Sequence, residues 1–224
     1  MNSVDLSPVY LSLKVAGIST LVTAVFGMLT AYILVRRDFF GKSLLESFVT
    51  LPLVLPPTVL GYYLLVLIGR QGFIGQALKS TFNINLVFTW QAAVIAASIA
   101  SFPLFVRSAQ ASIESIDVNL LKVARTLGKS EWQIFWQVSV PLAWRGILSG
   151  SILSFSRALG DFGATLMVAG SIPGKTQTVP LAIFDAVSIG NKDVALFLVS
   201  LITIVAILVL LVVTRLTRSR LTGF

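Results

Sequence analysis

The chain has 224 residues, of which 56% are hydrophobic and only 12% are charged, and its mean hydropathy is +0.92. A soluble domain carries about twice that charged fraction, so the composition excludes one and predicts a single all-α, polytopic membrane domain over residues 1–224. The chain has no Cys and no His, which excludes disulfides, thiol chemistry and most zinc sites, and its net charge of +8 suits cytoplasmic loops and anionic lipid better than nucleic acid.

Five stretches are long and apolar enough to be spanning helices, which need about 20 residues each. They lie at about 11–35, 47–69, 86–106, 146–170 and 194–214. Asp5 precedes the first one without a basic cluster, unlike a cleaved signal peptide, so residue 1 is expected in the mature protein. The apolar segment 176–190 is short and contains Pro180 and Asp185, which predicts an external helix that partly dips into the membrane.

The distribution of Lys and Arg predicts the orientation. With the N-terminus outside and the C-terminus inside, eleven of these residues fall in cytoplasmic segments and four in external loops. This is a clear positive-inside bias, and it places the charged loop 107–145 in the cytoplasm.

Pro52, Pro56 and Pro57 all fall in the second span. Each lacks an amide donor and clashes with the carbonyl four residues back, and freed carbonyls must face protein or a wet cavity in a membrane. We therefore expect a kinked helix that faces the bundle interior. The kink is either structural or lines an anion path that flexes during transport.

The loop 107–145 is predicted to hold two short helices. Asp117 can cap a helix from Val118, and its apolar residues, together with Leu127 just beyond, predict one stripe: Leu120, Leu121, Ala124 and Leu127. Gly128 is the expected helix stop, and Ser130 with Gln133 forms a capping-box pattern for the second helix. Pro141 suits the first turn of a new helix. Such a hairpin either only packs on the bundle or is a surface that another protein binds and acts on.

The fourth span contains Arg157 and Asp161, four residues apart on one helix face. An unpaired charge at membrane depth is costly, so we expect an ion pair. The pair is either structural, in which case replacing both residues by apolar ones should restore assembly lost in the single variants, or Arg157 supplies positive potential to an anion route. Gly160 and Gly163 flank the pair and are expected to allow close helix approach.

The run KVARTLGKSEWQIFWQVSVPL, residues 122–142, resembles the EAA loop of binding-protein-dependent ABC importer permeases. Lys122 and Val123 replace the Glu and the first Ala of the motif, so a contact that needs the Glu carboxylate is in doubt. The resemblance implies that the loop contacts a cytoplasmic ATPase. The coupling residues it implies are Asp117, Leu121, Lys122, Val123, Ala124, Arg125, Thr126, Leu127, Gly128, Ser130 and Pro141.

Two further stretches, 47–75 and 156–184, are similar to molybdate permeases and less closely to sulfate permeases. The resemblance implies a multi-pass protein of the cytoplasmic membrane that imports molybdate, with tungstate as a further substrate and sulfate or thiosulfate as the alternative. It implies a second copy of the chain, two cytoplasmic ABC ATPase subunits that bind ATP and Mg, and an external oxyanion-binding protein as partners. Membrane lipid surrounds the chain, and no cofactor, metal or catalytic residue is expected in it.

Two other classes of protein fit less well. An intramembrane enzyme needs a nucleophile and a base, but the chain lacks His and Cys, no Ser stands in a recognisable elbow, and Asp161 is expected to be paired. An ATP-independent carrier usually has broken helices in both halves, whereas here only the span with the prolines is predicted to break.

Overall fold

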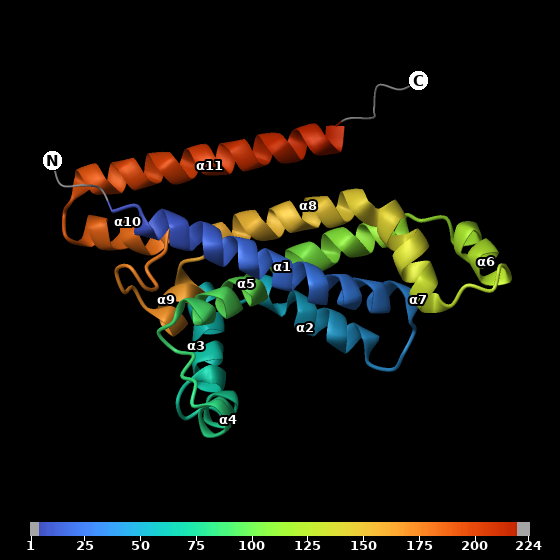
Figure 1. Ribbon diagram of the computed structural model, residues 1–224, viewed down its shortest axis with the longest axis horizontal. Coiled ribbons are helices and arrows are strands. Elements are labelled where there is room, and N and C mark those ends of the chain that lie inside the picture. The colour runs from blue at the N-terminus through green and yellow to red at the C-terminus, as the bar shows by residue number, and fades with distance from the viewer. Residues whose placement is uncertain (1–4, 219–224) are drawn as a thin grey trace.

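The computed structural model describes residues 5–218, and all regular structure in this range is helical (Figure 1). The helices are α1 (Ser7–Arg36), α2 (Lys42–Val54), α3 (Pro57–Ile68), α4 (Phe73–Phe82), α5 (Trp90–Glu114), α6 (Val118–Thr126), α7 (Glu131–Ile134), the π-helix η1 (Phe135–Ser139), α8 (Val140–Leu159), α9 (Gly163–Ala169), α10 (Val179–Ser188) and α11 (Lys192–Arg218). Among the described residues, α1, α5, the continuous run from α7 to α8, and α11 are long and apolar enough to cross a membrane, and the bent pair α2–α3 adds a fifth crossing if it is one span. The all-α polytopic bundle is confirmed.

The centre of the bundle is α5, which packs between α1 and α8. Its small side chains allow this, because they let helix backbones approach closely. Hydroxyl groups then reach the carbonyls of the neighbouring helix: Ser108 Oγ donates to Gly146 O at 2.9 Å, and Thr23 Oγ1 donates to Ser98 O at 3.3 Å. The alanines of α5 without exposed surface are Ala92, Ala93, Ala96, Ala97, Ala100 and Ala109.

Two helices extend beyond the predicted span limits. α5 continues past Arg107 to Glu114, because no helix breaker follows and the Arg107 guanidinium donates a hydrogen bond of 2.8 Å to Thr50 Oγ1 of α2. α8 begins at Val140. The connection between them is therefore residues 115–139, shorter than the predicted loop 107–145.

The segment 176–190 contains the helix α10, as predicted, and α10 is apolar but only ten residues long. Asp185 is accommodated because its carboxylate accepts hydrogen bonds from Ser171 Oγ and, at 2.7 Å, from Gln177 Nε2. Ser12 Oγ of α1 accepts from Val179 N at 2.7 Å. These contacts attach α10 and the loop before it to the bundle.

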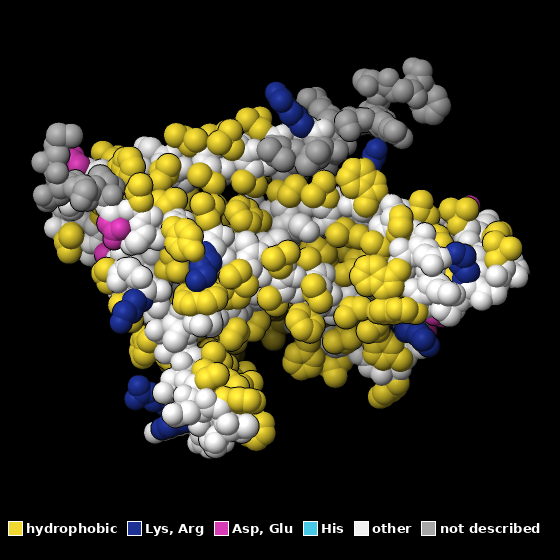
Figure 2. Space-filling view, in the orientation of Figure 1, with side chains coloured by type: hydrophobic (Ala, Val, Ile, Leu, Met, Phe, Trp, Pro, Cys, Tyr) yellow, Lys and Arg dark blue, Asp and Glu magenta, His cyan; other side chains and the backbone are white. Residues whose placement is uncertain are grey.

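The surface reflects this arrangement. Figure 2 shows hydrophobic side chains over most of the visible helix bundle, with Lys and Arg side chains around α4 and around α6 and α7 at the other end. Such a distribution is typical of a membrane-embedded band between two wet surfaces.

Close packing at the α5–α8 contact predicts a large effect from one added methyl group. A Cβ at Gly146 would lie 2.2 Å from Ser112 Cβ, whereas a Cβ at Gly17 of α1 would meet nothing within 4 Å. We expect Gly146→Ala to destabilise the protein by about 1–3 kcal/mol, as overpacking does, and Gly17→Ala to be neutral or stabilising, since Ala is the better helix former. Thermal unfolding in detergent measures both, and equal midpoints would contradict this packing.

Candidate functional site

The connection 115–139 folds into a helical hairpin that projects from one end of the bundle (Figure 1). Asp117 caps α6, as predicted, because its carboxylate accepts from Asn119 N at 2.8 Å. Gly128 has a φ of +77°, and the N–H of Lys129 bonds back to Ala124 O at 3.2 Å. The left-handed turn after α6 is thus confirmed, and it needs glycine because other residues are strained there.

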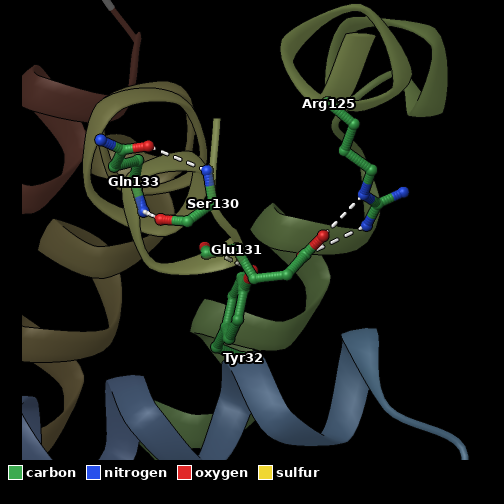
Figure 3. A network of polar contacts seen from close by, with 5 residues as sticks. All are labelled: Tyr32, Arg125, Ser130, Glu131 and Gln133. Carbon is green, nitrogen blue, oxygen red and sulfur yellow. Dashed lines mark hydrogen bonds and ion pairs between the residues drawn. The ribbon is translucent and has the colours of Figure 1, made fainter. Parts of the chain in front are cut away.

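The second helix of the hairpin begins with the predicted capping box. Ser130 N donates to Gln133 Oε1 at 2.8 Å, and Gln133 N donates to Ser130 Oγ at 3.3 Å (Figure 3). Both ends of the Gly128 turn are therefore held by local bonds, so the hairpin keeps its shape through its own sequence.

An ion pair joins the two arms of the hairpin. Arg125 contacts the Glu131 carboxylate through two hydrogen bonds, Nε–Oε1 at 2.7 Å and an NH2–Oε2 bond of 3.3 Å (Figure 3). These hydrogen bonds from Arg125 hold the pKa of the Glu131 carboxyl below its ordinary value. Tyr32 of α1 donates to the Glu131 carbonyl at 3.4 Å and so connects the hairpin to the bundle. Sequence analysis missed Glu131 and Tyr32, although opposite charges on either side of Gly128 were a visible signal for the first.

The apolar stripe predicted for α6 is only half right. Leu121 and Ala124 are buried, with 2% and 6% exposure, but Leu120 and Leu127 are exposed. α6 packs against the rest of the protein on one side only, so the residues at the edge of the stripe remain exposed. The exposed face of α6 and the turn after it, called the outer face below, carries three large apolar side chains that are about half exposed or more: Leu120, Val123 and Leu127. Val118 is also exposed but lies on the opposite side of α6. Of the other predicted coupling residues, Lys122, Arg125, Thr126, Gly128 and Ser130 are also exposed.

An aromatic group anchors the second arm. Phe135 is 1% exposed and contacts Tyr32 of α1 edge-on, with ring centroids 4.6 Å apart. Trp132 and Trp136 pack on the other sides of Phe135, at 5.6 and 5.0 Å, and stay half exposed. Phe135 is thus the buried member of this aromatic group.

Pro141 lies in the first turn of α8, as predicted, but α8 does not start as a separate helix. α7, η1 and α8 form one continuous helix from Glu131 to Leu159. A proline inside an α-helix lacks the N–H donor and clashes with the carbonyl four residues back. The π-helix just before Pro141 widens the turn, and Val140 N bonds to Phe135 O, five residues back. The widened turn accommodates the proline without a break.

The predicted kink in the second span is a complete break. The direction of the chain bends by 117° between α2 and α3. Pro52 lies inside α2 without ending it, whereas Pro56 precedes α3 and Pro57 is its first residue. Two successive prolines remove two donors and restrict the residue before them, which ends α2 at Val54.

The fourth span is also broken, which corrects the expectation of one helix over 146–170. α8 ends at Leu159, and the chain resumes as α9 at Gly163. The second break stands beside the first: a Cβ at Gly163 would lie 2.9 Å from Pro57 Cβ, so α9 needs glycine to approach α3. Gly160 has no neighbour of this kind, and the predicted close approach holds for Gly163 only. The span broken at the prolines therefore does have a counterpart.

The predicted ion pair lies at this second break. Arg157 NH1 is 3.2 Å from Asp161 Oδ1, and the two side chains are 29% and 1% exposed. Asp161 also accepts from Thr165 N at 3.0 Å and from Thr165 Oγ1 at 2.7 Å. The carboxylate therefore stabilises the first turn of α9 as well as pairing with Arg157. Sequence analysis missed Thr165.

The residues described, 5–218, bring together no group of three or more Asp and Glu side chains that could hold a metal. What the site offers is an exposed apolar hairpin joined by a continuous helix to a pair of broken helices. Broken helices in an apolar bundle are typical of the membrane component of a transporter.

Residues 23–222 match the family described as binding-protein-dependent transport system inner membrane component, and the chain belongs to this family. It is 48% identical to the molybdenum transport system permease protein ModB of Escherichia coli over 80% of this chain and 78% of that protein. It is 44% identical to ModB of Haemophilus influenzae, over 81% of this chain and 79% of that one. The chain is thus a transport component of the inner membrane.

Two solved structures share the fold at low sequence identity. One is a bacterial ABC transporter involved in alginate import, with a TM-score of 0.77, 16% identity, and coverage of 100% of this chain and 82% of that one. The other is the inward-facing MetNI methionine ABC transporter, with a TM-score of 0.72, 16% identity, and coverage of 96% and 95%.

The three bonds to Asp161 predict unequal effects of its partners. Asp161→Leu removes the acceptor of Arg157 and of two donors of Thr165, so we expect a loss of about 3–5 kcal/mol, as for a broken buried pair. Arg157→Leu should cost less, because Arg157 reaches solvent. Thermal unfolding and the yield of assembled complex measure both.

The double variant refines the test. Arg157→Leu/Asp161→Leu should not regain wild-type stability, because Thr165 keeps unsatisfied donors at about 1–3 kcal/mol. Arg157→Leu/Asp161→Asn is the matched control, since Asn retains an acceptor for Thr165 without the charge. Full recovery with the double Leu variant would show that the Thr165 bonds contribute nothing.

Proposed function

We propose that this chain is the permease subunit of an ABC importer that carries molybdate, with tungstate as a further substrate, across the inner membrane. The observation that carries the proposal is the hairpin with its apolar outer face, in a chain 48% identical to a molybdenum transport permease. The N-terminus lies outside and the C-terminus inside, because this orientation satisfies the positive-inside rule and puts the hairpin in the cytoplasm.

The outer face of α6 docks in a groove of a cytoplasmic ATPase, which binds ATP and Mg and hydrolyses the nucleotide. Three exposed large apolar side chains on one face of a short helix and its turn are unusual in water and typical of a helix that enters a groove. The working unit has two permease chains and two ATPase chains, because five spans are few to enclose an anion path. An external binding protein delivers the oxyanion and sets most of the selectivity.

The paired breaks, α2–α3 and α8–α9, supply the moving part of the pathway. Breaks expose backbone dipoles without formal charge, and such groups suit weak, transient contact with an anion. Arg157 is part-exposed beside the second break and adds positive potential there. A tight site is not needed, since tight binding would slow release.

The hairpin turn provides a test of coupling. Gly128 has a φ of +77° and open space around it, so Gly128→Val strains only the backbone. The strain of about 1–2 kcal/mol should lower the ratio of correctly folded to unfolded hairpin roughly five- to thirty-fold. We expect ATP hydrolysis to lose its stimulation by loaded binding protein, whereas Gly128→Asn, which tolerates this conformation, stays close to wild type. Stimulated ATPase activity of reconstituted transporter measures this, and normal stimulation in the Val variant would refute docking through this turn.

Substrate identity is tested by uptake of labelled molybdate into cells that carry this permease with its own partners. Unlabelled tungstate should compete at concentrations similar to molybdate, and sulfate should compete only in large excess. A sulfate or thiosulfate importer is the alternative, because the sulfate transport permease CysW of Synechococcus elongatus is 39% identical over 79% of this chain, although the match covers only 61% of that protein. Strong competition by sulfate would favour it, and uptake without any ATPase subunit would exclude an ABC importer.

A further inference from the structure

An apolar groove of about 360 Å³ opens between α11, α8 and α1. Its two hydroxyl residues offer no free donor, because Thr20 Oγ1 donates to Ala16 O at 2.7 Å and Ser151 Oγ to Ile147 O at 2.8 Å. The groove is lined by Thr20, Ser151, Ile152, Phe155, Leu208 and Val209.

α11 packs against the bundle near its N-terminal end and is separated from it farther along. Near the external end, Leu198 is 2% exposed and packs with Val179 and Ala182 of α10. Farther along, Ile207, Leu208 and Leu211 are more than half exposed. The groove therefore lies in the half of α11 that points toward the hairpin end of the molecule (Figure 1).

Two arginines lie at that end of the groove, on the two helices that flank it. Arg145 of α8 comes six residues before Ser151, and Arg215 of α11 comes six residues after Val209. Because α8 and α11 run in opposite directions (Figure 1), both offsets lead about 9 Å toward the hairpin end. Both arginines are exposed, and neither forms an ion pair with a described carboxylate.

The charges around the groove are of one sign. The stretches that form it, α1, α8 and α11 from Val194 onward, contain no Asp or Glu. Trp144, next to Arg145, is half exposed with the guanidinium 5.7 Å from its ring centre, as is typical of side chains at the level of lipid headgroups.

We propose that this groove is a binding site for an anionic phospholipid of the cytoplasmic leaflet, with one acyl chain along the groove and the headgroup phosphate between Arg145 and Arg215. The placement in that leaflet rests on the orientation given under the proposed function. An acyl chain needs no hydrogen-bond donors, which matches the lining, and guanidinium groups bind phosphate oxygens. A second copy of the chain fits less well, since a two-fold axis along the membrane normal would bring the same arginines to equal depth on both sides of the contact.

The test uses the purified complex in detergent, saturated with phosphatidylglycerol or with phosphatidylcholine of the same acyl chains, and counts retained lipid by native mass spectrometry. The wild type should retain phosphatidylglycerol preferentially. Arg145→Gln and Arg215→Gln should each lower this retention about five-fold, the equivalent of about 1 kcal/mol for a basic residue near an anionic surface. Arg145→Gln alone separates the groove from the basic residues that follow Arg215, because Arg145 lies on a different helix. Arg37→Gln/Lys42→Gln removes two charges from the α1–α2 connection and should leave retention unchanged.

Ile152→Trp tests the groove itself, since its side chain would occupy the space of the acyl chain and should abolish preferential retention while both arginines remain. Equal retention of the two lipids by the wild type, or unchanged retention in Arg145→Gln, would overturn the proposal. So would disulfide formation between two copies of a Leu208→Cys variant in membranes, because the chain has no other cysteine and this result would place a second copy over the groove. Molybdate uptake is not a readout here, so failure of the lipid site and failure of the proposed transport function remain distinct.

Discussion

The close approach of α5 to α1 and α8 is the constraint on which the other features depend. In a membrane there is no hydrophobic drive between helices, so contact area and interhelical hydrogen bonds must stabilise the bundle. Alanines without exposed surface line α5, and Ser108 reaches Gly146 O on α8. This rigid centre allows the chain to carry broken helices around it, since α2, α3 and α9 all contact α5.

The two breaks arise from different chemistry but form one contact. Pro56 and Pro57 end α2 by removing donors, whereas the α8–α9 break contains no proline and is stabilised by the Asp161 carboxylate at the start of α9. Gly163 then lets α9 approach Pro57 within contact distance. A change at either break is therefore felt at the other.

The parts predictable from sequence were those with local causes. The caps at Asp117 and Ser130, the left-handed Gly128 and the pairing of Arg157 with Asp161 depend on neighbours within a few residues, and all were confirmed. The second break was not predicted, because the apolar run carries across Gly160, although Asp161 four residues before Thr165 was a local signal for the start of a new helix. The joining of α8 to the hairpin helix through the π-helix η1 was not predicted either, because a proline in a first turn suggested a separate helix start.

The continuity of the helix from Glu131 to Leu159 gives the hairpin a mechanical link to the break. One helix of 29 residues, bent at η1 and Pro141 (Figure 1), runs from Glu131 of the Arg125–Glu131 pair to Leu159. Tyr32 and Phe135 hold its first turns against α1, close to the hairpin. Its other end meets the second break, where the Arg157–Asp161 pair and the bonds from Thr165 to Asp161 join α8 to α9. The hairpin and the second break are therefore the two ends of one hydrogen-bonded helix.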